Sequence, residues 1–357
     1  MKVLFTFYVP SGGVETLNRL RCKALKEIGI EGHLLYLENG SGLQNISGIP
    51  VYISPTDYQL QTLLMTQEYD AIVTTSDYLM TLRLRQIGYI GPILYEIQGL
   101  GTRDQAEQAL NEAEPILRDF CQGMLMPPTP HLVELATKIC PTIPRYIFSN
   151  PVDTDTFLPL NVKAPNRPII AWIGRLEANK NWELFLHIAH SLILVKSELL
   201  FWMFLDDKLS SEAERNSFWE IVQLRGLSEH IRVISNAPHA SMPEYLSLIG
   251  ESGGLLLSTS HLEGFGYAVA EAISCRCPVL STDSDGVRLF IRHNETGKFF
   301  AMGDVSGAVK EILELMDNQC LREMIRRNGQ DYISRLMSPQ QYAANFHQMI
   351  LSLKGSS

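Results

Sequence analysis

Short apolar runs alternate with segments of helical periodicity along the first half of the chain. The first run spans residues 3–8, and residues 15–28 follow it with apolar positions at helical spacing and Gly29 as the stop. Further buried strands are expected at residues 33–37, 71–74, 93–97, 124–126 and 145–148. Apolar strands of this length that alternate with helices predict a parallel sheet covered by helices on both faces.

The alternation restarts after residues 151–168, PVDTDTFLPLNVKAPNRP, which lack periodicity and are expected to form a linker. Strands are predicted at 169–173, 199–205, 231–234, 254–257, 279–281 and 298–300, and helices at 181–195, 211–224, 267–273 and 339–353. This pattern predicts an α/β protein with two Rossmann-like doubly wound domains that face each other across a cleft. Residues 1–157 are expected to form the first domain, completed by a C-terminal helix within 338–357, and residues 158–337 are expected to form the second.

Composition and charge narrow the class of partner. A chain of 357 residues suits two domains, and 45% hydrophobic with 19% charged residues is typical of a globular protein. The formal net charge of −9 argues against a nucleic-acid partner, which would need a basic surface. Four cations, Arg19, Arg21, Lys23 and Lys26, cluster on the first predicted helix. They form either an ordinary solvated face or a peripheral membrane contact.

The cysteines and the apolar runs indicate the compartment. Six cysteines are scattered without a CxxC pair, which predicts buried, reduced thiols and no zinc site. Uncharged apolar stretches of about 18 residues are missing, so no transmembrane helix is expected. We therefore expect a cytoplasmic protein, with peripheral contact at the inner membrane face as the alternative.

Two groups of residues that follow predicted strands suit an anionic ligand. Gly12 and Gly13 precede a helix, where backbone N–H groups can approach an anion closely. The third glycine of a dinucleotide fingerprint is missing, so a plain turn is the favoured interpretation of this pair on its own. Arg175 ends the first strand of the second half, and Lys180 lies near a helix start. A guanidinium and an ammonium at these places suit a phosphate pair, although two surface cations would give the same pattern.

The stretch HLEGFGYAVAE, residues 261–271, holds two carboxylates around a Gly-Phe-Gly loop. Glu263 belongs to the loop, whose free N–H groups can face an anion or sugar hydroxyls. Glu271 lies more than one turn into the following helix, which rises about 1.5 Å per residue. The two carboxylates are therefore expected to address different parts of one extended ligand rather than to share a proton.

Four motifs together resemble the family 4 retaining glycosyltransferases of GT-B fold. They are GGVE (12–15), NPVDTDTF (150–157), GRLEANKN (174–181) and EGFGYAVAE (263–271), against family patterns GGxE, NGVDxxxF, GRLxxxKG and EGFGxxxxE. CRCPVLSTDSDG (275–286) is similar to the family's CGxPVVAxxxGG. The resemblance spans nearly the whole chain. It implies transfer of a hexose, with retained configuration, from a nucleotide-sugar to a glycan or lipid-linked acceptor in polysaccharide biosynthesis. UDP-glucose is the commonest donor in the family, followed by GDP-mannose.

The resemblance also implies a role for each matching residue. Arg175 and Lys180 would bind the diphosphate and stabilise the leaving nucleotide. Glu263 would hold donor-sugar hydroxyls with the backbone amides that follow it, and Glu271 would bind the ribose. The implied catalytic residues are Arg175, Lys180 and Glu263. The implied donor site comprises Gly12, Gly13, Gln98, Arg175, Lys180, Val233, Ile234, Ser235, Asn236, Glu263, Gly264, Phe265, Gly266 and Glu271.

Several positions depart from the family pattern. Gln98 stands where the family has a histidine near the reacting sugar, and an amide can hydrogen-bond but cannot act as a base. Pro151 replaces the glycine at the junction and is expected to stiffen it. Arg276 also replaces a glycine. Asp285 replaces another and either binds a sugar hydroxyl or caps the next helix.

Neither a metal nor a cofactor is expected. Asp153-x-Asp155 and Asp283-x-Asp285 spell DxD, a cation motif of a different glycosyltransferase fold, but Arg175 supplies positive charge here together with Lys180. Two other functions remain open. A GT-B sugar-nucleotide epimerase would need acid/base residues, which Gln98 does not provide. A non-catalytic nucleotide-sugar-binding subunit would tolerate the missing histidine.

Overall fold

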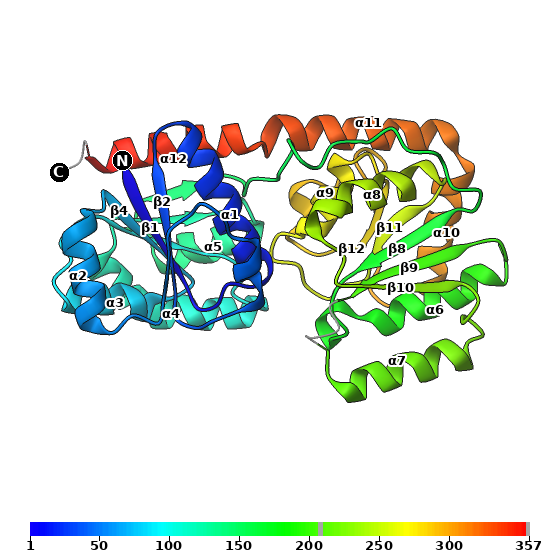
Figure 1. The fold of residues 1–357 in the computed structure, drawn as a ribbon, viewed down its shortest axis with the longest axis horizontal. Coiled ribbons are helices and arrows are strands. Elements are labelled where there is room, and N and C mark those ends of the chain that lie inside the picture. The colour runs from blue at the N-terminus through cyan, green and yellow to red at the C-terminus, as the bar shows by residue number, and fades with distance from the viewer. Residues whose placement is uncertain (206–209, 355–357) are drawn as a thin grey trace. The chain divides into compact units, whose positions relative to one another are not determined.

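The chain divides into two compact units. The computed structural model describes residues 1–205 and 210–354. Unit 1 comprises Met1–Val152 and Leu336–Ser357, and unit 2 comprises Asp153–Arg335. The chain leaves unit 1 once and returns to it with its last helix, drawn in red in Figure 1. The limits expected from the sequence lie after residues 157 and 337.

Unit 1 is built on a parallel sheet of seven strands in the order β3–β2–β1–β4–β5–β6–β7. Its strands are β1 (Lys2–Phe7), β2 (Glu31–Tyr36), β3 (Val51–Ile53), β4 (Ala71–Thr75), β5 (Ile93–Glu96), β6 (Gly123–Met126) and β7 (Arg145–Ile147). β3 was not predicted from the sequence, because a half-buried edge strand of three residues gives too short an apolar run to recognise.

Helices cover both faces of this sheet (Figure 1). They are α1 (Gly12–Glu27), α2 (Asp57–Gln67), α3 (Tyr78–Gln86), α4 (Arg103–Phe120), α5 (Pro130–Ile139) and α12 (Pro339–Lys354). Side chains alternate between the faces along each strand. On β1, Phe5 packs against Phe346 of α12 with ring centroids 5.7 Å apart, whereas Leu4 joins the core that contains Leu60 of α2.

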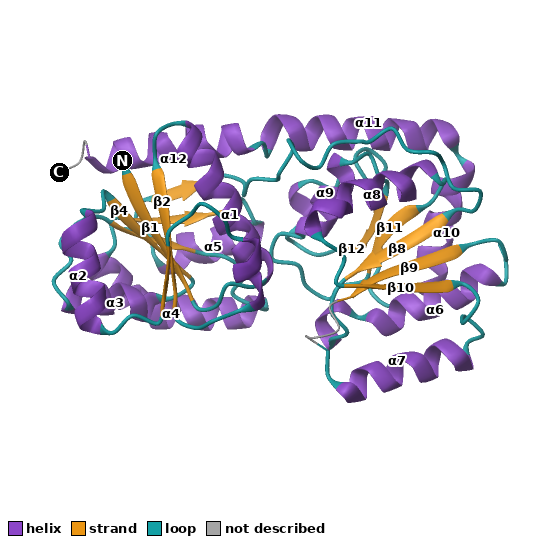
Figure 2. Ribbon diagram, in the orientation of Figure 1, coloured by secondary structure: helices purple, strands orange, loops and turns teal. Residues whose placement is uncertain are grey.

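Unit 2 is a second parallel sheet, of six strands in the order β10–β9–β8–β11–β12–β13. Its strands are β8 (Ile169–Ile173), β9 (Leu200–Leu205), β10 (Ile231–Ser235), β11 (Leu255–Ser258), β12 (Val279–Thr282) and β13 (Lys298–Phe300). Its helices are α6 (Trp182–Ile193), α7 (Glu212–Leu224), α8 (Met242–Glu251), α9 (Tyr267–Ser274), α10 (Val305–Asp317) and α11 (Gln319–Leu336). Figure 2 shows α6 and α7 on one face of the sheet and α8 and α9 on the other. The predicted fold class, two doubly wound α/β domains with parallel sheets, is confirmed.

The segment predicted as a linker is partly packed. Residues 151–168 have no helix or strand, and all of them are described. Val152 and Phe157 are nevertheless fully buried. The Ser274 hydroxyl donates a 2.6 Å hydrogen bond to the Phe157 carbonyl. The first part of this segment is therefore anchored chain, and only its later residues behave as an exposed connection.

The predicted basic face of the first helix is wrong for Arg21. Arg21 is fully buried in α1, and its Nη1 donates to both carboxylate oxygens of Glu96 on β5 at 2.8 Å. Helical spacing places Arg21 on the stripe of α1 that faces the sheet, where Glu96 compensates its charge. Arg19 is half-buried, and Lys23 and Lys26 are exposed. Among the helices of the described residues, none has the length and apolar character needed to cross a bilayer.

The cysteines are free thiols and most of them are buried. Burial raises the pKa of Cys22 to about 12 and that of Cys140 to about 11, so these thiols stay protonated near neutral pH. Cys320 is exposed, which corrects the expectation that every cysteine is buried.

Candidate functional site

Two loops meet at the carboxyl edge of the sheet in unit 2. β8 and β11 are neighbours in the sheet, so the loops that follow them, 174–181 and 259–266, lie next to each other. Asn179 joins them, because its Oδ1 accepts from the Leu262 N–H at 3.2 Å and its carbonyl accepts from the His261 N–H at 2.8 Å. Thr259 Oγ1 lies 3.0 Å from the Lys180 carbonyl. These bonds fix the backbone on either side of the predicted site.

Lys180 and Glu263, which are 83 positions apart in the sequence, form an ion pair across these loops. Lys180 Nζ lies 2.7 Å from Glu263 Oε1, and the two side chains are 22% and 13% exposed. The Ser260 hydroxyl donates to the same oxygen at 2.7 Å. An ammonium carries three N–H donors, so Lys180 can hold Glu263 and still donate to a second anion. The pair therefore offers fixed positive charge beside an acceptor for hydroxyl groups.

Two glycines give the Glu263 loop its shape. Gly266 precedes α9 with φ +86°, a left-handed conformation that favours glycine, and a Cβ there would come within 2.8 Å of Val287 Cγ1. Gly286 approaches the loop so closely that a Cβ would lie 2.2 Å from the Glu263 carbonyl oxygen. Phe265 turns its ring into the core, 5.6 Å from the Phe290 ring centroid. Its side chain therefore belongs to the core and is not available to a ligand.

Glu271 has a different partner from Glu263. It lies on α9, is 8% exposed, and its Oε1 is 3.1 Å from His239 Nε2. His239 follows β10 and packs its ring against Phe157 at a centroid distance of 5.0 Å. His239 was not among the site residues expected from the sequence, since it belongs to none of the motifs that carry the family resemblance. Its position just after a strand, at the carboxyl edge, was the signal that could have identified it.

Arg175 is the more accessible of the two predicted phosphate ligands. Its side chain is 49% exposed, and its Nη2 lies 3.1 Å from Glu177 Oε1. Arg175 belongs to the same loop as Lys180 but makes its contact on Glu177 rather than Glu263. An exposed ion pair of this kind is worth little, so Arg175 can exchange Glu177 for an anionic ligand at small cost.

A cavity of about 480 Å³ lies beside β10, which carries residues of the implied donor site. It is lined by Leu176, Leu205, Arg215, Phe218, Trp219, Val233 and Ser235. Of the four donor-site residues implied at positions 233–236, Val233 and Ser235 line this cavity. Ile234 and Asn236 do not line it, and Asn236 adopts a left-handed φ of 52° at the strand end. The lining shows that aromatic side chains of α7 meet β10 here, which the sequence analysis did not anticipate.

Three predicted residues belong to unit 1. Gly12 and Gly13 are the first residues of α1 and are exposed, so the free N–H groups of the helix N-terminus are accessible there. Gln98 follows β5 and is half-buried. Its side-chain amide exchanges two hydrogen bonds with Asn150, at 3.0 and 2.9 Å. The sequence analysis did not identify Asn150 as a partner of Gln98.

The DxD sequences and Asp285 have local partners. Arg288 Nη2 lies 2.8 Å from Asp283 Oδ2, and its Nη1 lies 3.3 Å from Asp285 Oδ1. The hydrogen bond from Arg288 lowers the pKa of Asp283. Among the described residues, no group of three or more His, Cys, Asp or Glu side chains is arranged to hold a metal ion.

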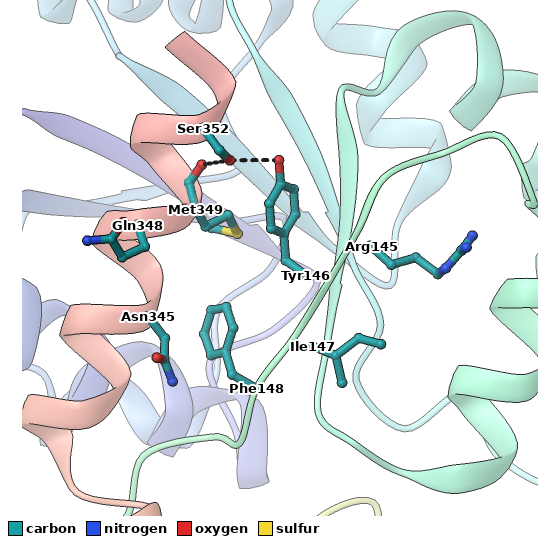
Figure 3. A pocket seen from close by; sticks show the side chains of 8 residues that line it. All are labelled: Arg145, Tyr146, Ile147, Phe148, Asn345, Gln348, Met349 and Ser352. Atoms are coloured by element: carbon teal, nitrogen blue, oxygen red, sulfur yellow. Dashed lines mark hydrogen bonds between the residues drawn. The ribbon is translucent and has the colours of Figure 1, made fainter. Parts of the chain in front are cut away.

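A second cavity lies in unit 1, and none of the predicted site residues lines it. It measures about 390 Å³ and lies between β7 and α12 (Figure 3). Tyr146 and Phe148 point toward α12, while Arg145 and Ile147 point away from it. The Tyr146 hydroxyl is hydrogen-bonded to Ser352 Oγ at 2.9 Å. This contact ties the helix to the edge strand, which indicates a structural role.

The fold is shared with solved glycosyltransferase structures. Sucrose-phosphate synthase of Thermosynechococcus elongatus superposes with a TM-score of 0.82 at 16% identity, and the match covers 100% of both chains. Anabaena HepE, solved with UDP and glucose, gives a TM-score of 0.80 at 15% identity over 99% of this chain and 100% of its own. At these identities the likeness establishes the fold, which is GT-B.

The family follows from the sequence of unit 2. The model of the family described as Glycosyl transferases group 1 matches residues 154–332, half of the chain, so the chain belongs to this family of sugar transferases. The 2-deoxystreptamine N-acetyl-D-glucosaminyltransferase of Niallia circulans is 24% identical over 56% of this chain and 49% of its own. The alpha-D-kanosaminyltransferase of Streptomyces kanamyceticus is 26% identical over 46% of this chain and 40% of its own. The chain thus spans about half, or less, of the curated relatives it matches.

Proposed function

We propose that the chain is a retaining glycosyltransferase that moves a hexose from a nucleotide-sugar to a glycan or lipid-linked acceptor in polysaccharide or glycoconjugate biosynthesis. The observation that carries the proposal is the Lys180–Glu263 pair at the carboxyl edge of unit 2, within the region that matches the family. Sugar transferases are the relatives whose sequences align here, and ligands of doubly wound sheets bind at this edge.

In the proposed reaction, cationic side chains replace a metal. The bond from the anomeric carbon to the phosphate oxygen breaks, and the acceptor oxygen forms the new bond on the same face of the sugar. The acceptor proton passes to the leaving phosphate. Lys180 and Arg175 stabilise the negative charge that develops on this phosphate. Glu263, held by Lys180 and Ser260, accepts hydrogen bonds from donor-sugar hydroxyls. No cofactor takes part.

We infer that the donor carries UDP, with UDP-glucose as the specific donor. HepE, which shares the fold, was solved with UDP-glucose, and this supports the choice without deciding it. A thermal-shift series with UDP, GDP and ADP tests the base. A selective ligand at a hundredfold excess over its Kd adds about 2.7 kcal/mol of stability, which raises Tm by several degrees. We expect this shift with UDP alone, and a larger response to GDP would redirect the assignment to a GDP-sugar.

Turnover separates a transferase from the alternatives. We expect slow hydrolysis of UDP-glucose, in the presence of EDTA, when no acceptor is supplied. Tight binding of a nucleotide-sugar without turnover of UDP- or GDP-sugars, even with acceptors present, would identify a non-catalytic subunit. Conversion to an epimeric nucleotide-sugar would identify an epimerase.

His239 is expected to support nucleotide binding through Glu271. In His239→Ala, Glu271 loses the 3.1 Å contact that orients its carboxylate toward the ribose. The loss of one hydrogen bond predicts a Kd for UDP that rises about three- to tenfold, measured by calorimetry. His190→Ala is the matched control, because His190 bonds a backbone carbonyl, that of Arg225, at 2.9 Å in the same unit. An unchanged Kd in His239→Ala would remove His239 from the site.

A further inference from the structure

Gln98 and Asn150 form a closed pair of side-chain amides. Gln98 Nε2 donates to Asn150 Oδ1 at 3.0 Å, and Asn150 Nδ2 donates to Gln98 Oε1 at 2.9 Å. Gln98 follows β5, and Asn150 follows β7, so the pair joins the ends of two strands separated by β6. Each amide uses one donor and one acceptor on the other, which restricts how either side chain can turn.

Glu96 fixes the orientation of the two side-chain amide groups. Glu96 Oε1 accepts from Gln98 Nε2 at 3.3 Å, and the same carboxylate accepts from Arg21 at 2.8 Å and from the Thr75 hydroxyl at 2.7 Å. A carboxylate ion-paired with a guanidinium can only accept hydrogen bonds. Gln98 must therefore turn its NH₂ group, not its carbonyl, toward Glu96. The orientation of Asn150 follows from that of Gln98, so neither amide can be flipped.

These contacts leave the Gln98 amide with one unused hydrogen-bonding group, an acceptor lone pair. Both N–H groups of Nε2 are used, one by Glu96 and one by Asn150. Oε1 accepts one bond from Asn150 and keeps its second lone pair. Glu96 is 1% exposed and Asn150 is 3% exposed, whereas Gln98 is half-buried. Gln98 is thus the accessible member of this group, and the hydrogen-bonding capacity that it leaves unused is that of an acceptor.

We propose that Gln98 takes part in sugar transfer as a fixed hydrogen-bond acceptor for a substrate hydroxyl, and that Asn150 and Glu96 are the positioning residues that hold it in this state. The inference rests on the proposed function and extends it. The resembled family has a histidine at the position of Gln98. A neutral imidazole carries one donor and one acceptor nitrogen, and it can exchange them by changing tautomer. Gln98, oriented by the buried Arg21–Glu96 pair, has no such choice, and it selects a hydroxyl that donates.

The first test is Asn150→Asp, which is close to isosteric. It replaces the N–H donor that faces Gln98 Oε1 with an oxygen at about the same place, so two acceptors oppose each other and Gln98 is displaced. We expect kcat for transfer to fall about 10- to 100-fold. The Kd for UDP should stay within a factor of about two, because the proposed nucleotide ligands belong to unit 2.

Asn345→Asp on α12 is the matched control. Asn345 Oδ1 accepts from Gln341 Nε2 at 3.1 Å on the surface of the same unit. The new carboxylate keeps that acceptor, so kcat should not change. Wild-type kcat in Asn150→Asp, with the control also unchanged, overturns the proposal. A fall in both variants also overturns it, because the effect would then come from added charge rather than from the amide pair.

The second test uses the pH profile of Gln98→Glu, which a purely structural role would not alter. The charged group bonded to this position is Glu96 on β5, and Glu96 in turn interacts with the Arg21 guanidinium on α1 and the buried phenol of Tyr342 on α12. Repulsion from Glu96 should raise the pKa of the new carboxyl group. Below this pKa the group is neutral: it donates one hydrogen bond, where Gln98 donates two, and it keeps the carbonyl acceptor of Gln98.

We therefore expect the kcat of Gln98→Glu, relative to wild type, to fall at least about tenfold between pH 5 and pH 8 as the new carboxyl ionises. A ratio independent of pH overturns the proposal. Side-chain amide NMR signals of Gln98, assigned by their loss in Gln98→Glu, should move in Asn150→Asp whether or not sugar is transferred. A wild-type protein that turns over no nucleotide-sugar refutes the proposed function, whereas unmoved signals refute the positioning by Asn150.

Discussion

Lys180→Ala is expected to lower kcat for sugar transfer about 100- to 1,000-fold, the largest effect of any single substitution in unit 2. The variant removes the ammonium that would neutralise the leaving phosphate. It also leaves the Glu263 carboxylate, 13% exposed, without its 2.7 Å ion pair and with the Ser260 hydroxyl as a remaining partner. An unpaired, half-buried carboxylate beside a diphosphate adds repulsion to the lost attraction. Steady-state transfer or donor hydrolysis measures the effect.

A double-mutant cycle separates these two terms. Lys180→Ala combined with Glu263→Gln removes the repulsion, so nucleotide affinity should recover partly while kcat stays low. Lys196→Ala is the matched control, because Lys196 forms an ion pair with Asp317 at 2.9 Å elsewhere in the same unit. Its kinetics should equal those of the wild type. If Lys180→Ala retains kcat within about twofold of wild type, the electrostatic role assigned to this lysine is wrong.

The sequence was sufficient to predict the fold class and to single out Lys180 and Glu263, each within its own motif. Uniform apolar runs identified most strands, because strands buried on both faces are apolar throughout. The order of the strands in the sheet could not be predicted, because periodicity does not indicate which strands pair. The contact between Lys180 and Glu263 depends on β8 and β11 being neighbours. Family motifs therefore located both residues, but only the strand order explains why they touch.

The polar side chains that pair with Arg21 and Gln98 were not predicted from the sequence. Arg21 was assigned to a surface by its charge, although Leu17 and Leu25, four residues to either side, mark a buried stripe. A cation at an apolar position of a helix implies a buried anion, and Glu96 is that anion. Asn150 was overlooked because the junction motif was considered only for its backbone. Side chains that pair with site residues leave no periodic pattern in the sequence. They can therefore be identified only from the contacts in the structure.

Breaking the Arg21–Glu96 pair is expected to have the largest effect on stability. Arg21 is fully buried, with its Cζ 3.8 Å from the centre of the Phe5 ring. Burial lowers the pKa of Arg21, but the Glu96 carboxylate together with the neighbouring Tyr342 and Cys22 outweighs burial, and the net shift is upward. Arg21→Met leaves Glu96 as an uncompensated buried charge, which costs about 3–5 kcal/mol of unfolding free energy.

The location of the tryptophans allows the loss of stability in Arg21→Met to be measured within the intact chain. All four, Trp172, Trp182, Trp202 and Trp219, belong to unit 2. Tryptophan fluorescence therefore follows unfolding of unit 2, whereas far-UV circular dichroism follows both units. In urea, Arg21→Met should shift the part of the dichroism transition that belongs to unit 1, while the fluorescence transition stays in place. A shift of the fluorescence transition of equal size would show that the loss is not local to unit 1.

The double variant Arg21→Met with Glu96→Leu separates stability from activity. Replacing a buried ion pair by apolar side chains of similar volume is often neutral or stabilising, so most of the lost unfolding free energy should return. Gln98 does not recover, because Nε2 loses the carboxylate that sets its orientation and keeps Asn150 as its partner. We expect a folded protein that binds UDP normally and transfers sugar at least about tenfold more slowly than wild type. Full activity in this stable variant would show that the buried pair serves the fold alone.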